Sequence, residues 1–228
     1  IKNCVITTGG SDGINAVYSG ADITLSDNTI SGNQGAPMRI DPSYLGVPNA
    51  TDTYADNLEN YILVVPYTQD IDEVLTWKKV DIDYKVTGAG TIYIAKPVTI
   101  EPGVHVYFDA DCDMFIREEG SLSAIGTASD KIVFRGVTPV AGSWGGIYFQ
   151  FTSSVLNVIS HAEIAHAGNS NFDGAVYMWA EPTVTVTNVD FSDLGSCAFF
   201  AGGAADGNPN LTQNNNTFVS VPQVLCED

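Results

Sequence analysis

Three aspartates stand at alternate positions in the segment "DADCDMF", a spacing that could serve a metal ion. They are Asp109, Asp111 and Asp113. Alternate residues of a β-strand point to the same face, so a strand through this segment would present the three carboxylates together. Oxygen ligands of this kind suit Ca²⁺, and a Ca²⁺ site is one interpretation. The other is a solvated acidic face, since spaced charges commonly just face water.

A second candidate site combines two aromatic rings with a carboxylate. The segment "AVYMWAEP" matches "AVYSGAD" near the start of the chain, but only the later copy carries a tryptophan. Tyr177 and Trp179 share strand parity, and Glu181 continues it. An apolar ring face with a polar edge suits stacking on a sugar. These three residues could therefore form a carbohydrate-binding platform.

Two histidines beside a glutamate form a third group, in the segment "SHAEIAHAG". His161, Glu163 and His166 could bind a metal or act as an acid–base pair. The internal repeat described below places His161 in a column otherwise occupied by Asn and Asp. A structural role at that position is therefore the favoured interpretation.

The charge balance excludes several partners. The chain of 228 residues has 27 Asp and Glu against 9 Lys and Arg, a formal net charge of −18. Nucleic acids and anionic membranes are bound through clustered Lys and Arg, so neither is an expected partner. No apolar run approaches the roughly 20 residues that a membrane-spanning helix requires, so membrane insertion is not expected either.

An apolar residue and a polar residue recur together along the chain and indicate the fold. The apolar column consists of Ile6, Ile30, Ile164, Phe191 and Phe218. The polar column, three residues upstream in each unit, consists of Asn3, Asp27, His161, Asn188 and Asn215. The spacings are 24 residues in the first group and 27 in the second. Units of this length with two or three short strands are typical of the coils of a β-solenoid.

The predicted fold class is therefore all-β, a parallel β-helix with coils of about 24–27 residues. Asn side chains stacked from coil to coil would explain the polar column. A β-sandwich is the alternative, but it does not predict two columns in register. The segment 70–82 is the one stretch that could hold a helical turn.

The chain divides into three sections within a single β-helix domain spanning 1–228. We expect the first coils in 1–40, an irregular coil or insertion in 41–95, and regular coils in 96–228. The sequence begins at Ile1 and shows no amphipathic helix that would cover either end of a solenoid. We expect it to be a segment of a longer protein.

Two of the four cysteines fall at nearly equivalent places on successive coils. Cys197 follows Phe191 by six residues, and Cys226 follows Phe218 by eight. Adjacent coils bring equivalent Cα atoms within about 5 Å, which a disulfide tolerates. A Cys197–Cys226 bridge and two buried free thiols are the two interpretations. Cys4 and Cys112 are expected to be free in both.

The run "VTIEPGVHVYF … GSLSAIGTASDKIVFRG … GSWGGIYF … ISHAEIAHAG" (98–168) resembles the right-handed parallel β-helix repeat proteins of the pectate-lyase-like superfamily, which bacteria secrete or display. The resemblance implies a right-handed β-helix and a secreted or cell-surface location. It does not decide the function, because the superfamily includes lyases, hydrolases, adhesins and proteins of other roles.

Three functions remain open. The first is a non-catalytic exported module that binds carbohydrate or cell-surface material and requires no cofactor, with Ca²⁺ as the one candidate ion. The second is a polysaccharide lyase or glycoside hydrolase. Lyase chemistry would need a base near the acidic residues, and Arg117 is the nearest candidate; the polygalacturonase-type motifs of this fold are absent from the sequence. The third is an architectural spacer within a surface protein.

Overall fold

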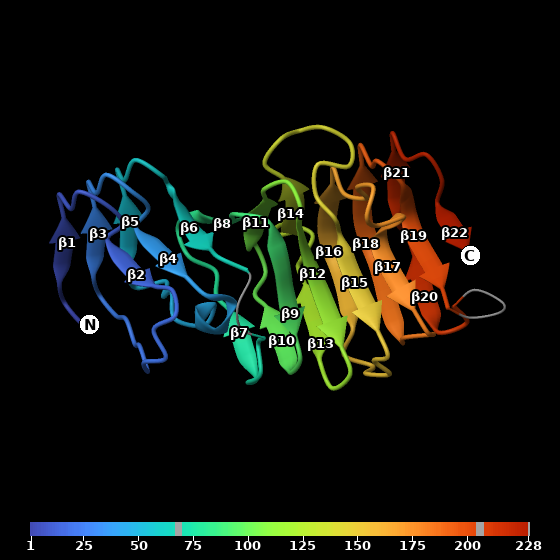
Figure 1. The fold of residues 1–228 in the computed structure, drawn as a ribbon, viewed down its shortest axis with the longest axis horizontal. Coiled ribbons are helices and arrows are strands. Elements are labelled where there is room, and N and C mark those ends of the chain that lie inside the picture. Colours follow the sequence, from blue (N-terminus) through green and yellow to red (C-terminus); the bar gives the residue numbers. More distant parts are fainter. Residues whose placement is uncertain (67–69, 204–207, 228) are drawn as a thin grey trace.

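The computed structural model describes residues 1–66, 70–203 and 208–227. Within these ranges the chain winds as a parallel β-solenoid of about nine turns, with almost no helix. The two ends of the chain lie at opposite ends of the long axis (Figure 1). The all-β solenoid predicted from the repeat is therefore confirmed.

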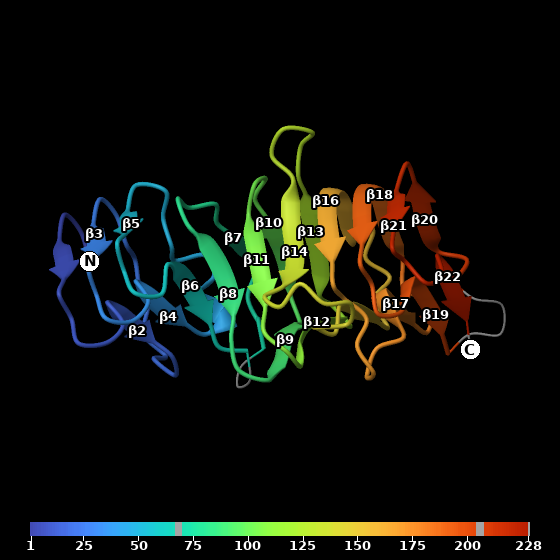
Figure 2. The ribbon, with the colours of Figure 1, turned by 90° about the horizontal axis from the view of Figure 1, so that it is seen from above.

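The strands follow one another coil by coil, as seen also from above in Figure 2. The first three coils hold β1 (Val5–Thr7), β2 (Ile14–Ala16), β3 (Thr29–Ser31), β4 (Met38–Ile40), β5 (Thr53–Ala55) and β6 (Tyr61–Val64). The next three hold β7 (Leu75–Trp77), β8 (Asp83–Val86), β9 (Gly90–Ile94), β10 (Pro97–Ile100), β11 (His105–Phe108), β12 (Cys112–Arg117), β13 (Ser121–Ile125), β14 (Ile132–Gly136) and β15 (Ile147–Gln150). The last three hold β16 (Val158–Ala165), β17 (Gly174–Trp179), β18 (Val184–Ser192), β19 (Cys197–Gly202), β20 (Leu211–Asn214), β21 (Thr217–Val219) and β22 (Leu225–Glu227).

Stacking of the coils produces three parallel sheets. A three-stranded sheet has the order β1-β3-β5, and a six-stranded sheet has the order β22-β19-β17-β15-β12-β9. A thirteen-stranded sheet has two branches that meet at β16. The first part of β16 pairs with β13 and its second part pairs with β14, because the strand bends at His161 between them.

The corners are made by residues in the left-handed region of backbone space. The polar column has positive φ throughout: 52° at Asn3, 58° at Asp27, 47° at His161, 56° at Asn188 and 54° at Asn215. Asn and Asp tolerate this conformation better than other non-glycine residues. The column was correctly identified in the sequence, but its physical reason is the backbone corner rather than a stack of paired side chains.

Paired side chains do occur in the first coils, one and six residues after the corner residue Asp27. Asn28 Nδ2 donates to Asp52 Oδ1 at 2.8 Å, and Asn33 Nδ2 donates to Asn57 Oδ1 at 2.9 Å. Their oxygens also accept backbone N–H groups from the preceding coil, as in the 3.0 Å bond from Cys4 N to Asn28 Oδ1. These buried amides thus satisfy corner N–H groups that the sheets leave without a partner.

The interior is a continuous apolar stack. Phe191 lies in register with Ile164 on one side and with Phe218 on the other, as the repeat predicted. The rings of Phe191 and Phe218 stack with centroids 5.4 Å apart. Trp144 is also fully buried, stacked on Phe108, and its indole N–H donates to the Ala165 carbonyl at 2.8 Å.

The middle of the chain is where the cross-section changes. The three-stranded sheet ends at β5, and the six-stranded sheet begins at β9. Residues 70–82, the one stretch that could have held a helical turn, instead contain β7, which pairs with β10. In the described residues the one helical turn is a 3₁₀ turn at Pro42–Tyr44. No helix among the described residues is both long and apolar enough to cross a membrane.

Candidate functional site: an aromatic row on the six-stranded sheet

The outer face of the six-stranded sheet carries one aromatic side chain from each of five successive strands. We call this set the aromatic row; it consists of Tyr93 (β9), Phe115 (β12), Tyr148 (β15), Tyr177 (β17) and Phe200 (β19). Strand register places each residue directly beside the next. Neighbouring parallel strands lie about 4.8 Å apart, so the row extends about 19 Å along the solenoid.

The rings of the row contact one another. Centroid distances are 5.6 Å for Tyr93–Phe115, 4.4 Å for Phe115–Tyr148, and 4.6 Å for both Tyr148–Tyr177 and Tyr177–Phe200. The first three pairs are edge-to-face and the last is stacked. Tyr93 is 37% exposed, whereas Phe200 is only 6% exposed. Burial, with a smaller effect of Tyr177, raises the pKa of Tyr148 to about 12, so its hydroxyl remains a hydrogen-bond donor at neutral pH.

A polar row runs beside the aromatic row, two residues further along each strand. Arg117, Gln150 and Trp179 lie in mutual register on β12, β15 and β17. Arg117 lies over the Tyr93 ring, 5.0 Å from its centroid, and forms an ion pair with Asp70. A Cβ added to Gly203 would fall 2.8 Å from the Trp179 ring, so the indole lies against that backbone. We call the aromatic row and the polar row together the strip. It combines the apolar faces of the rings with the hydrogen-bonding groups of the polar row.

The structure separates the three residues of the predicted sugar platform. Tyr177 and Trp179 lie on the same half-buried outer face of β17. Glu181 lies beyond the strand at a corner, exposed, with φ of +57°. Its backbone carbonyl accepts a hydrogen bond from Asn210 at 3.0 Å. The two aromatic residues therefore belong to the strip, and Glu181 belongs to its edge.

The three aspartates do not share one strand, contrary to the premise of the Ca²⁺ interpretation. Asp109 and Asp111 lie in the corner between β11 and β12, and Asp113 lies within β12. Asp109 contacts Lys85 and Thr87, and Asp111 is exposed. Asp113 is buried, 8% exposed. The described residues contain no group of three or more His, Cys, Asp or Glu arranged to bind a metal ion.

The histidines and the carboxylates beside them lie along the thirteen-stranded sheet. His161 and His166 form two separate corners of β16, and Glu163 between them pairs with Arg135. Asp190 pairs with Lys131 and accepts a hydrogen bond from Thr217, and these contacts lower its pKa. His105 lies 3.2 Å from Asp83. Arg117, the candidate base, lies instead on β12 of the six-stranded sheet and forms an ion pair with Asp70.

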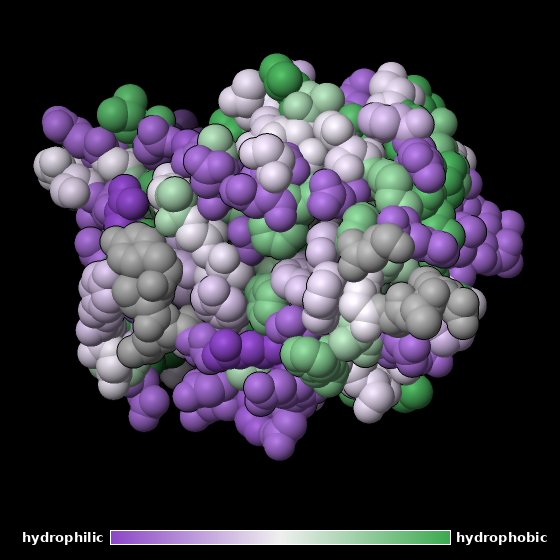
Figure 3. All heavy atoms as spheres, turned by 45° about the vertical axis from the view of Figure 1, so that its right-hand side comes forward, coloured by the Kyte–Doolittle hydropathy of each residue, from purple (hydrophilic) through white to green (hydrophobic). Residues whose placement is uncertain are grey.

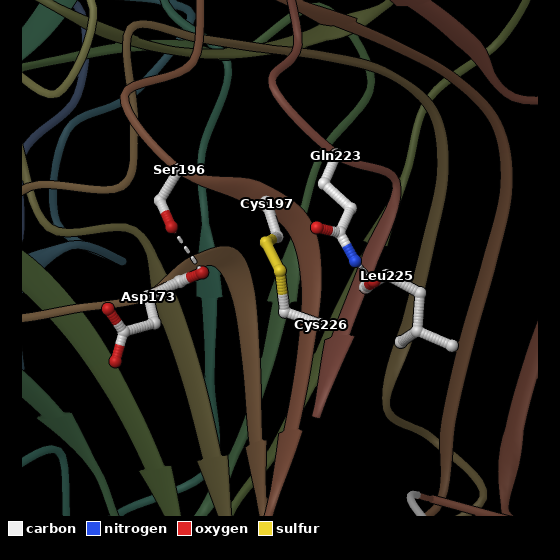
Figure 4. Close-up of a disulfide and its surroundings, with 6 residues drawn as sticks. All are labelled: Asp173, Ser196, Cys197, Gln223, Leu225 and Cys226. Atoms are coloured by element: carbon white, nitrogen blue, oxygen red, sulfur yellow. Dashed lines mark hydrogen bonds between the residues drawn. A yellow bond between two sulfur atoms is a disulfide. The ribbon is translucent and has the colours of Figure 1, made fainter. Parts of the chain in front are cut away.

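Cys197 and Cys226 form a disulfide between β19 and β22, with Cα atoms 6.1 Å apart (Figure 4). In strand register Cys226 lies beside Phe200 rather than beside Cys197, so the bridge crosses the last strand pair diagonally. Cys4 is a free exposed thiol and Cys112 a free buried one. Burial, with smaller effects of Asp109 and Asp113, raises the pKa of Cys112 to about 12.

Sequence reasoning found two members of the strip and missed most of it. Tyr93, Phe115, Tyr148 and Phe200 were not identified, because successive members of the row are separated by 22, 33, 29 and 23 residues. The available signal was an aromatic residue at an outward position of each strand of one sheet. On the surface, hydrophobic side chains appear as green patches between hydrophilic ones (Figure 3).

No protein-family model, curated protein or solved structure matches this chain. The comparisons therefore give no support to a relationship with the pectate-lyase-like superfamily or to a bacterial origin.

Proposed function

We propose that this solenoid is a non-catalytic carbohydrate-binding module whose binding surface is the aromatic row with its neighbouring polar row. The observation that carries the proposal is the unbroken register of five aromatic residues on one outer face. Aromatic side chains offer sugars an apolar surface, and the adjacent groups can bond to hydroxyls. Gln150 and Arg117 supply such groups along the strip.

The preferred ligand is a neutral polysaccharide. The net charge of −18 repels polyuronates and sulfated glycans. The one cation in the polar row, Arg117, is already paired with Asp70. A neutral chain avoids this repulsion, and its binding is expected to depend little on salt.

Binding can be measured by affinity electrophoresis and calorimetry. The panel comprises cellohexaose, mannohexaose, xylohexaose and a β-galactan as neutral glycans, with polygalacturonate as the acidic comparison. Tyr148→Ala should weaken binding of the retained glycan by roughly tenfold, the order expected for losing one well-placed aromatic contact. Trp179→Ala should have a similar effect.

Tyr107→Ala is the matched control, because Tyr107 lies on β11 in the thirteen-stranded sheet and outside the strip. Equal losses of glycan affinity in Tyr107→Ala and Tyr148→Ala would contradict the placement of the binding surface on the strip. If the unsubstituted protein binds none of these glycans, the proposal is wrong and the role of architectural spacer is favoured.

The alternative function is a polysaccharide lyase or glycoside hydrolase, and one observation favours it. His105 Nδ1 lies 3.2 Å from Asp83 Oδ1, an arrangement in which a carboxylate can orient a general base. New reducing ends, or ultraviolet absorbance from eliminated double bonds, would reveal turnover of the same panel. Turnover lost in His105→Ala would establish this alternative, whereas no turnover would rule it out for these substrates.

We also propose that the protein is exported by a bacterium to its surface or medium. The support is the disulfide, which persists in oxidising compartments, and the resemblance of residues 98–168 to exported β-helix proteins. Fractionation of the source cells tests the location. Recovery of the protein with reduced Cys197 and Cys226 in the cytosol would contradict it.

A further inference from the structure

Asp113 is a buried residue whose carboxylate lacks a hydrogen-bond partner for one of its oxygens. The residue is 8% exposed, and its Oδ1 atom has no hydrogen-bond partner. A buried carboxylate oxygen without a partner is costly, so few are retained in proteins without a role. A ligand can satisfy such an acceptor by donating the missing hydrogen bond.

The position of this carboxylate relates it to the aromatic row. Asp113 precedes Phe115 by two residues on β12, so both side chains project from the outer face of the sheet. It lies in register with Thr91 on β9. On the other side, a Cβ added to Gly145 would meet Asp113 Cβ at 2.8 Å and the Phe172 ring at 2.9 Å. Asp113 and Phe172 therefore flank the same point beside the row.

Phe172 links this point to the centre of the row. Its ring centroid lies 5.9 Å from that of Tyr148 and 6.0 Å from that of Tyr177. Phe172 belongs to an exposed turn closed by its own N–H bonding to the Asn169 carbonyl. Phe172 thus lies between the centre of the aromatic row and the point beside Gly145 that Asp113 flanks.

We propose that Asp113 is a specificity-determining residue that accepts a hydrogen bond from a hydroxyl of a sugar stacked on the aromatic row. The inference rests on the proposed carbohydrate-binding function and replaces the Ca²⁺ role considered for Asp113. A sugar hydroxyl is a neutral donor that satisfies one acceptor without requiring further carboxylates. Asp109 and Asp111 lie in the preceding corner and are not needed.

Ionisation of Asp113 should affect this binding. Burial raises the pKa of Asp113 to about 6, opposed by the Thr91 hydrogen bond. The charged form is the stronger acceptor, so affinity should rise with pH through this range. The groups around it are Tyr93, Tyr148 and Cys112 in the sheet, Arg117 on the same strand, and the exposed carboxylates of Asp111 and Asp173 in the flanking corner and turn.

Calorimetry with the tightest-binding of cellohexaose, mannohexaose and xylohexaose tests the inference at about pH 5 and about pH 7.5. Asp113→Asn should weaken binding about tenfold at the higher pH, the order of one hydrogen bond to a charged group, and should abolish the pH dependence. Asp111→Asn and Asp173→Asn are the matched controls, and both should bind like the parent.

The outcomes separate the two proposals. If the parent binds none of the glycans, the proposed function fails. If Tyr148→Ala loses binding while Asp113→Asn keeps the affinity and the pH profile of the parent, the function stands and the role of Asp113 is wrong. A pH dependence that is lost in Asp111→Asn instead would also overturn the assignment.

Discussion

At the scale of single residues, Asp113 couples the stability of the solenoid to pH. Its folded-state pKa of about 6 lies above the ordinary value of 3.8 because burial disfavours the charge. The folded state therefore holds the proton more tightly than the unfolded state, and stability falls as pH rises from about 4 to about 6. Above that window the charged carboxylate costs up to about 3 kcal/mol.

We predict that Asp113→Asn changes the free energy of unfolding in a pH-dependent way. Relative to the parent, the variant should gain up to ~3 kcal/mol between pH 4 and pH 7.5, because Asn does not ionise. Urea unfolding at both pH values measures this gain. Asp111→Asn, at the exposed neighbouring carboxylate, is the control. A difference between variant and parent that is the same at both pH values would contradict the buried ionisation.

At the scale of elements, the corners depend on residues that accept positive φ. Asn188 has φ of +56° within β18 and occupies the same column as His161 and Asn215. A β-branched side chain is strained in this conformation, whereas glycine adopts it freely. The backbone conformation at the corners thus limits which residue types the polar column can contain.

We predict that Asn188→Val lowers the free energy of unfolding by about 1–2 kcal/mol. Asn188→Gly should stay close to the parent, because glycine carries no Cβ. Thr185→Val, at an extended position of the same strand, controls for placing a branched apolar side chain there and should have little effect. Chemical denaturation of the three variants provides the measurement. Equal losses in Asn188→Val and Asn188→Gly would mean that the Asn side chain, not the backbone conformation, is what matters.

The last strand depends on a covalent link. The Cys197–Cys226 bridge joins residues 29 apart and attaches β22 to β19. A disulfide that closes a loop of this length restricts the unfolded chain. It can thereby raise the free energy of unfolding by at most about 3–4 kcal/mol. Because each coil contacts only its neighbours, the effect should be concentrated in the final coil.

We predict that Cys226→Ser increases amide hydrogen exchange in β22 and leaves β12 and β15 unchanged. Cys4→Ser, which removes a free exposed thiol, is the control. Mass spectrometry of the unreduced digest tests the bridge itself. Peptides containing Cys197 and Cys226 that are alkylated without prior reduction would show that it does not form.

At the scale of the whole molecule, the dominant long-range force is self-repulsion. A net charge of −18 disfavours the compact state, and salt screens that repulsion over about 10 Å at 0.1 M. The ion pairs Lys78–Glu101 and Lys96–Glu119 are largely exposed, so their loss in salt should cost little.

We therefore predict that the melting temperature rises between low salt and about 0.5 M NaCl. Differential scanning calorimetry measures the shift. CaCl₂ at matched ionic strength should add nothing beyond screening, since Asp109, Asp111 and Asp113 do not converge. A melting temperature that falls with NaCl would show that the ion pairs outweigh the charge repulsion. A larger rise in CaCl₂ than in NaCl would indicate that the protein binds Ca²⁺.

The sequence by itself determined the solenoid, the interior stack of Ile164, Phe191 and Phe218, and the position of the polar corners. These features recur at one coil length, and residues one coil apart are neighbours in a solenoid, so spacing in the sequence translates directly into contact. Only the tertiary structure decided the surface. Loops of different length separate Tyr93, Phe115 and Tyr148, so no constant spacing reveals the row that the strand register assembles. Likewise, Asp113 has the pattern of a solvent-facing residue, but the packed structure leaves it 8% exposed beside Gly145, which the ring of Phe172 flanks from a different coil.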